Sequence, residues 1–140
     1  MTTPAQLADP VVQAFLDTRE TGVLATLDPD GTPLAVPVWF IHDPDALYVP
    51  TVTATRKVEN LARDGRVAFT ADAGRGDGIR GLLLQGRAEP LPDGPARRSI
   101  ADRLLAKYDP HLERRWRGRT VPPDRVVLRV VPSRVRTWGL

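Results

Sequence analysis

Three threonines at alternate positions run directly into two cations in the segment TVTATRK, which covers residues 51–57. If a strand carries Thr51 and Thr53 and a helix begins at Arg56 with Thr55 as its N-cap, the hydroxyls and the first backbone N–H groups converge. A helix N-terminus carries a partial positive charge, so Arg56 and Lys57 are unfavourable there unless an anion binds. The segment therefore predicts a phosphate site. The alternative is that the threonines favour a strand and the cations are solvated.

The rest of the sequence offers few groups that could perform chemistry unaided. There is no cysteine, which excludes disulfides, thiolate catalysis and thiolate metal sites. The two histidines, His42 and His111, lie far apart, and neither Ser99 nor Ser133 stands in a nucleophile elbow or beside a histidine. We therefore expect no metal site and no serine hydrolase. Any reaction should be carried by a bound cofactor.

Length and composition are those of one globular domain covering residues 1–140, with 41% hydrophobic and 26% charged residues. No apolar run approaches the ~20 residues that a membrane span needs, and the N-terminus lacks the pattern of a signal peptide. These features predict a cytoplasmic protein without membrane contact. The net charge of +3 is compatible with an anionic ligand.

Hydrophobic patterns divide the chain into strands joined by short turns and a few short helices. Strands are expected over residues 22–27, 32–42, 47–51, 66–71, 82–90 and 126–138, and helices after residue 9, over 56–64 and around 100–108. The first two strands are followed by turns and not by the crossover helices that a parallel sheet requires. The pattern predicts a mainly β fold, an antiparallel barrel of six or seven strands with short flanking helices.

Several local features are predicted as well. Gly65 should end the second helix in the left-handed conformation, and Gly86 should mark a bulge or a close approach. The glycine-rich stretch 72–81 joins two strands and opens no helix, so it is expected to be a hairpin connection. The basic, proline-interrupted stretch 113–125 is expected to be a loop, and Pro132 should bend the last strand.

The order of motifs over nearly the whole chain is distinctive. It comprises the hairpin GVLATLDPDGTPLAVPVWF, then LYVPT, then T-x-T-R-K-V-x-N-L-x-x-D-x-R-V-A-F, then QGRAEPL and finally VVLRVVPSRVRTW. In this order the chain resembles the pyridoxamine 5'-phosphate oxidase-like, or flavin/deazaflavin oxidoreductase, superfamily of split β-barrels. The resemblance implies a homodimer with two flavin-type cofactor sites at its interface.

The resemblance also implies which residues bind the cofactor. The phosphate would be held by Thr51, Thr53, Thr55, Arg56 and Lys57, with Asn60 supporting that loop. The ring would lie at the strand formed by Val36, Pro37, Val38 and Trp39, where proline is tolerated because no neighbouring strand needs its N–H. Gln85 and Gly86 would flank the ring. Trp138 would contribute from the other subunit, or alternatively lies in the core or the dimer interface.

Within the superfamily the chain resembles the group that uses coenzyme F420 more than the longer pyridoxamine 5'-phosphate oxidases. This implies a reductase that transfers a hydride from the reduced deazaflavin to a small unsaturated or quinone-like substrate. FMN is the alternative cofactor. Further alternatives are an FMN- or haem-binding carrier and a cofactor-free interaction module. No residue stands out as catalytic, and His42 and Tyr48 are the candidates for proton donation.

A basic cluster lies in the stretch predicted to be a loop, where Arg115, Arg117 and Arg119 surround Trp116. Coenzyme F420 carries a phosphodiester and an oligoglutamate tail, so such a cluster could form the rim of its site. The alternatives are a solvated loop and a nucleic-acid patch. Because the cluster stands alone, without a recognition helix, we expect no nucleic-acid partner.

Overall fold

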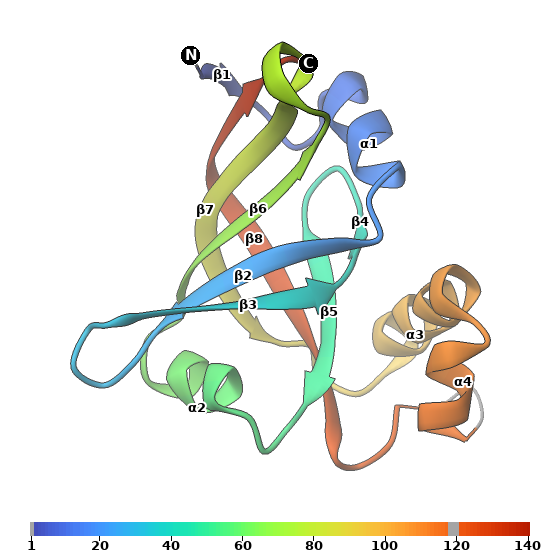
Figure 1. Cartoon of the computed structure of the whole chain (residues 1–140). Coiled ribbons are helices and arrows are strands. Elements are labelled where there is room, and N and C mark those ends of the chain that lie inside the picture. Colours follow the sequence, from blue (N-terminus) through green and yellow to red (C-terminus); the bar gives the residue numbers. More distant parts are fainter. Residues whose placement is uncertain (1, 118–120) are drawn as a thin grey trace.

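A computed structural model describes residues 2–117 and 121–140 (Figure 1). The described residues form one curled antiparallel sheet whose strands are β1 (Thr3–Ala5), β2 (Thr21–Leu27), β3 (Pro33–Trp39), β4 (Ile41–His42), β5 (Leu47–Val52), β6 (Arg66–Ala73), β7 (Arg80–Pro90) and β8 (Arg125–Trp138). The helices are α1 (Pro10–Asp17), α2 (Arg56–Arg63), α3 (Pro95–Tyr108), α4 (His111–Trp116) and the short 3₁₀ turn η1 (Gly76–Gly78). The prediction of a mainly β antiparallel barrel with short helices is confirmed.

The strands follow the order β3-β2-β6-β7-β8-β5-β4, and β1 pairs with β8 outside this path. Strand β3 is therefore an edge of the sheet. The long strand β8 holds the barrel together because it pairs with β7, with β5 and with β1. In Figure 1, α3 and α4 lie together on one side of the barrel, whereas α2 sits below the β2–β3 hairpin.

The main core lies inside the curl of the sheet. Alternate residues of the strands point inward, so Leu24, Phe69 and Leu84 are fully buried, and α1 adds Phe15 and Leu16 at one end. Phe69 also explains a glycine: a Cβ on Gly22 would lie 2.2 Å from the Phe69 ring. The ring can therefore cross β2 only where no side chain exists.

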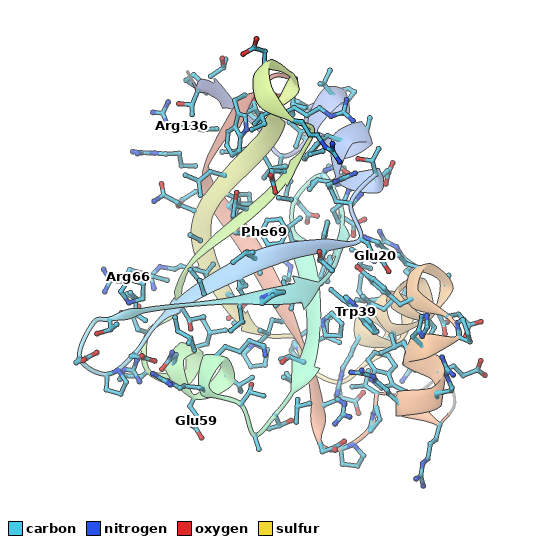
Figure 2. All side chains as sticks on the ribbon, viewed as in Figure 1. Glu20, Trp39, Glu59, Arg66, Phe69 and Arg136 are labelled. Carbon is cyan, nitrogen blue, oxygen red and sulfur yellow. The ribbon has the colours of Figure 1, made fainter. Side chains whose placement is uncertain are left out.

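A second core joins α3 and α4 to the outside of the barrel. Leu104, Leu105 and Tyr108 of α3 pack with Leu112 and Trp116 of α4 against Ile41, Tyr48 and Val127. Figure 2 shows Trp39 on this side of the barrel, toward α3 and α4, whereas Phe69 lies among the strands. The Trp39 ring stacks on that of Tyr108, with centroids 4.6 Å apart and planes 7° from parallel.

The strand expected over residues 32–42 is interrupted at Phe40. Its backbone N–H donates to the Tyr108 hydroxyl at 2.8 Å, and its carbonyl accepts from Lys107 Nζ at 2.8 Å. Two side chains of α3 thus take the place of a neighbouring strand, so β3 and β4 are separate. Strand β1 was not predicted, because three residues carry too short a pattern.

Other local predictions have mixed outcomes. Gly86 does mark an irregularity: Gln85 pairs with Arg134 and Gly86 with Pro132, and a Cβ on Gly86 would lie 2.0 Å from the Val131 carbonyl oxygen. The stretch 72–81 is a hairpin connection between β6 and β7, as expected. The prediction that Gly65 adopts the left-handed conformation is wrong, because α2 is followed by an extended Asp64 and the chain continues directly into β6.

Candidate functional site

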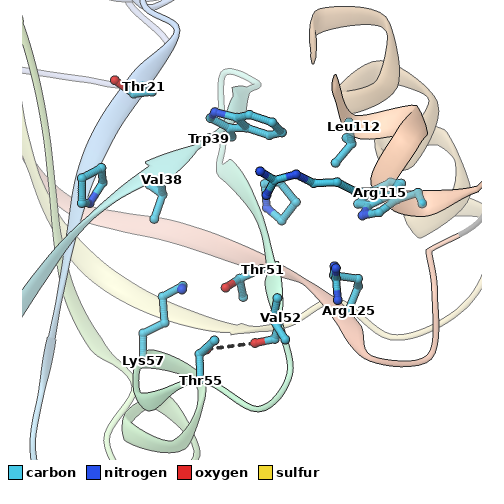
Figure 3. A pocket seen from close by; sticks show the side chains of 13 residues that line it. Thr21, Val38, Trp39, Thr51, Val52, Thr55, Lys57, Leu112, Arg115 and Arg125 are labelled. Atoms are coloured by element: carbon cyan, nitrogen blue, oxygen red, sulfur yellow. Dashed lines mark hydrogen bonds between the residues drawn. The ribbon is translucent and has the colours of Figure 1, made fainter. Parts of the chain in front are cut away.

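A cavity of about 360 Å³ opens between the edge strand β3, the end of β5, the first turn of α2 and helix α4 (Figure 3). It is lined by Thr21, Pro37, Val38, Trp39, Pro50, Thr51, Val52, Thr55, Lys57, Leu112, Arg115, Trp116 and Arg125. The cavity joins residues that lie as far apart in the sequence as Thr21 and Arg125. Its lining contains three cations and no carboxylate, so it is suited to an anionic ligand.

Lys57 is the cation that the cavity explains best. It is the second residue of α2, and Figure 3 shows its side chain extending from the helix into the cavity. Among the described residues it has no hydrogen-bond or ion-pair partner, although it is half-buried, and burial lowers the pKa of its ammonium group. A partly desolvated cation without a partner is unfavourable unless a ligand supplies the opposite charge.

Two of the three threonines line the cavity. Thr51 is buried on β5, and Thr55 stands at the N-cap position of α2. Thr53 follows the end of β5, is exposed and does not line the cavity. The prediction that Thr55 caps the helix with its side chain is wrong, because its hydroxyl donates to the Val52 carbonyl at 2.9 Å. Strand β5 ends at Val52, before Thr53 and Thr55, so strand alternation does not point the three hydroxyls the same way.

Arg56 turns away from the cavity. Its guanidinium makes two hydrogen bonds to Asp28, from Nε to Oδ1 at 3.0 Å and from Nη2 to Oδ2 at 2.6 Å. Asn60 lies in the same cluster and is almost fully buried, where its amide donates to Thr26 and to Asp28 at 3.0 Å each. Neither Arg56 nor Asn60 lines the cavity, so the geometry gives both a supporting position.

The edge strand forms one wall. Pro37, Val38 and Trp39 line the cavity, whereas Val36 packs against the main core. Strand β3 pairs on one side alone, with β2, so its other edge is free to face a ligand. Proline at this position removes a donor that would otherwise lack a strand partner.

The opposite wall is helical, and it was not predicted as such. Residues 111–116 form α4, so the expectation of a loop from residue 113 is wrong for the first part of that stretch. Leu112 and Trp116, four residues apart and both buried, were the signal that could have indicated the helix. This spacing was overlooked because both residues stand in an arginine-rich stretch.

Helix α4 and the start of β8 bring two further cations to the cavity. The Arg115 guanidinium lies over the Trp39 ring, 5.5 Å from its centroid, and Arg125 contacts Asp124 at 2.7 Å. Of the predicted basic cluster, Arg115 and Trp116 line the cavity, Arg117 does not, and Arg119 lies outside the described residues. Arg125 was not predicted to belong to this group, because it stands apart from the cluster in the sequence.

The remaining predicted residues lie elsewhere in this chain. Gln85 is exposed on β7, Gly86 packs against β8, and Trp138 lies beside Gly81 near the C-terminal end of β8. None lines the cavity. A contribution from a second subunit remains a prediction for these three residues.

The two candidate proton donors also lie outside the cavity lining. The His42 ring nitrogens contact Gln13 at 2.8 Å and Asp17 at 2.7 Å, and burial lowers the pKa of the imidazole despite the Asp17 carboxylate. Tyr48 is buried in the second core. Within the described part of the chain, no group of three or more metal-ligating side chains occurs, and no helix has the length and apolar character to cross a membrane.

The sequence profile of the family described as pyridoxamine 5'-phosphate oxidase matches residues 8–139. The chain belongs to this family. The matched region includes all residues that line the cavity, from Thr21 to Arg125. The basic cavity of this pyridoxamine 5'-phosphate oxidase family member therefore lies within the family's domain. No protein of curated function matches it significantly.

Solved structures share the fold of this family member. A conserved hypothetical protein from Mycobacterium tuberculosis is 27% identical, with a TM-score of 0.79 over 93% of this chain and 83% of that one. A FAD-binding protein from Mesorhizobium loti is 22% identical, with a TM-score of 0.74 over 98% and 96% of the two chains. The haem storage protein HutZ from Vibrio cholerae is 18% identical, with a TM-score of 0.74 over 92% of each chain. At these last two identities the likeness concerns the fold.

Proposed function

We propose that the chain is an oxidoreductase that binds a flavin-type cofactor in the basic cavity, and that this cofactor is coenzyme F420. The observation that carries the proposal is Lys57, a half-buried cation that has no partner among the described residues and extends into the cavity. Family membership and the FAD-binding structure of the same fold support a flavin-type ligand.

The residues around the cavity fit such a cofactor. Lys57, Thr51 and Thr55 would hold its phosphate by charge and hydroxyl donors. The wall formed by Pro37, Val38 and Trp39 would hold its ring, because an unpaired strand edge and apolar side chains suit a flat aromatic group. When bound and reduced, the cofactor would supply a hydride for a small unsaturated or quinone-like substrate. The residues of the chain would bind the cofactor and the substrate, orient them toward each other and exclude water.

The number and distribution of the cations favour coenzyme F420 over FMN. FMN has one phosphate, which Lys57 and its neighbours would satisfy. Arg115 and Arg125 enter from the helical side of the cavity, from segments far from Lys57 in the sequence. They would suit the phosphodiester and oligoglutamate tail of coenzyme F420, which carry further negative charges.

Haem is the less favoured alternative, although a haem storage protein shares the fold. None of the residues lining the cavity is histidine, cysteine, methionine or tyrosine, the side chains that commonly ligate haem iron. Of the two histidines, His42 is already bonded at both ring nitrogens and His111 contacts Arg114.

The proposal includes a cytoplasmic homodimer. On the outer face of β2, β3 and β6, small or apolar residues lie in register: Val23 pairs with Pro37, and Ala25 pairs with both Ala35 and Ala68. Val23 is 37% exposed in the single chain. A partly exposed apolar patch of this kind is suited to burial against a second copy. Size-exclusion chromatography with light scattering tests this, and a monomer at micromolar concentration would contradict it.

The test of the function is a titration of the purified protein with coenzyme F420, with FMN and with haemin, each followed by its own fluorescence or absorbance. We expect tight binding of coenzyme F420, weaker binding of FMN and no specific haem spectrum. Turnover is then measured with the reduced coenzyme and a series of quinones and enones. Tight binding of FMN with weak binding of F420 would move the protein to the flavin branch. Failure to bind either one would overturn the proposal.

A further inference from the structure

Asp28 is a nearly buried carboxylate that the cavity does not use. It begins the turn between β2 and β3, and its side chain is 9% exposed. The hydrogen bonds from Arg56, and then those from Asn60, hold the pKa of this carboxyl below its usual range, so it is ionised at neutral pH. An anion beside an anion-binding cavity is unfavourable for ligand binding by simple electrostatics.

The carboxylate ties helix α2 to the β2–β3 hairpin through one face of the helix. Arg56 and Asn60 are four residues apart and both donate to Asp28. Arg63, three residues further, donates to the Leu27 carbonyl and to Asn60 Oδ1. The backbone of Asp28 is fixed in turn, because its N–H donates to Thr32 and its carbonyl accepts from Gly31.

The Asp28 contacts and one buried apolar residue, Leu61, hold the rotation of α2. The helix has eight residues, which is too short to be stable alone, and its N-cap makes no side-chain hydrogen bond. Its buried residues are Asn60, which belongs to the Asp28 cluster, and Leu61, which packs in the main core. The polar contacts with Asp28 therefore act together with Leu61 to set which side of the helix faces the hairpin. Lys57 follows Arg56 by about 100° around the helix axis, so the same contacts direct its ammonium group into the cavity.

We propose that Asp28 positions Lys57, by way of Arg56 and Asn60, and that Arg56 is a positioning residue and not a ligand of the anion. The inference rests on the proposed function, since it assigns how the cavity holds its anionic cofactor. It predicts that a negative charge promotes the binding of an anion. If Asp28 acted through its charge alone, it would weaken the binding of an anion.

The decisive variant is Asp28→Asn, titrated with coenzyme F420 and with FMN. The amide keeps an oxygen where Oδ1 accepts from Arg56 Nε and Asn60, but it places an NH₂ donor where Oδ2 accepts from Arg56 Nη2, so it loses the charge and the two-point contact with Arg56. We expect affinity to fall by about tenfold, the equivalent of one charge-assisted hydrogen bond. The matched control is Asp30→Asn, which removes the same charge from the same turn, where Asp30 accepts from the Thr32 N–H and acts on Arg56 only through longer-range charge, without a hydrogen bond among the described residues of α2. It should bind as tightly as the parent or slightly more tightly.

A second single variant, Arg56→Gln, and the double variant with Asp28→Asn complete a double-mutant cycle. Arg56 is 64% exposed, so its loss should leave the fold intact. We expect Arg56→Gln to weaken binding and the double variant to be no weaker than Asp28→Asn. Hydrogen exchange of the α2 amides without ligand should be faster in both single variants. Unchanged or tighter binding by Asp28→Asn overturns the inference, as does unchanged binding by Arg56→Gln if Asp28→Asn does not fold. A parent protein that binds neither cofactor refutes the proposed function before these variants are compared.

Discussion

The chain has two lysines, and they occupy opposite situations. Lys57 extends into the basic cavity and has no partner among the described residues. Lys107 donates to the Phe40 carbonyl at 2.8 Å and lies over the Phe40 ring, 4.0 Å from its centroid. Burial lowers the pKa of both ammonium groups. What separates the two lysines is whether the described residues of the protein supply a partner for the ammonium group.

The largest effect should follow from Lys57→Ala. Loss of a charge-assisted contact costs about 1.5–3 kcal/mol, so affinity for coenzyme F420 should fall about 10- to 150-fold. Fluorescence titration measures this. The control is Arg98→Ala, which removes an equal charge from the exposed surface of α3 and should leave the affinity unchanged. Equal losses in the two variants would mean that overall charge, and not the cavity, attracts the ligand.

The next largest effect should follow from Tyr108→Phe. This change affects the structural region around Lys107 and not the cavity. The Tyr108 hydroxyl accepts the Phe40 N–H and lies 2.7 Å from the Glu20 carbonyl oxygen. Without it a buried N–H loses its acceptor, so the free energy of unfolding should fall by about 1–3 kcal/mol. Urea denaturation measures the change. Cofactor affinity should stay within about twofold, because the ring that stacks on Trp39 is kept.

A smaller effect should appear in the pH dependence of binding. Burial lowers the pKa of Lys57, so its ammonium loses its proton at a lower pH than an exposed lysine does. Affinity for the anionic cofactor should therefore decline as the pH rises through that lowered pKa. Lys57→Arg should bind without this decline, because a guanidinium stays charged. Parallel pH profiles for the two proteins would show that another group titrates.

The smallest effect concerns stability at alkaline pH. Burial lowers the pKa of Lys107 to about 8, against an ordinary value of 10.5. Between these values the unfolded chain binds more protons than the folded one, so the free energy of unfolding should rise with pH. Denaturation at pH 8 and pH 10 should show a smaller rise in Lys107→Met than in the parent. An equal rise in both would assign the effect to other groups.

Much of the fold was predictable because its signals are local. The turn sequence DPDG and the alternating residues on either side of it fix the β2–β3 hairpin, and Gly86 marked the irregularity between β7 and β8. Helix α4 was missed because its two apolar residues, Leu112 and Trp116, sit among arginines and are buried in the second core, formed by α3 and residues of β4, β5 and β8 that lie far away in the sequence. The break at Phe40 was missed because its cause lies in side chains almost 70 residues later.

The sequence by itself indicated where most strands lie and excluded thiol chemistry. It also placed two cations, Arg56 and Lys57, at the start of a helix. The tertiary structure alone decided which of these two cations faces the cavity. The reason is that adjacent helical residues point about 100° apart, so the choice depends on what the helix packs against. Here the partner is Asp28, 28 residues earlier in the chain, and no local pattern connects the two.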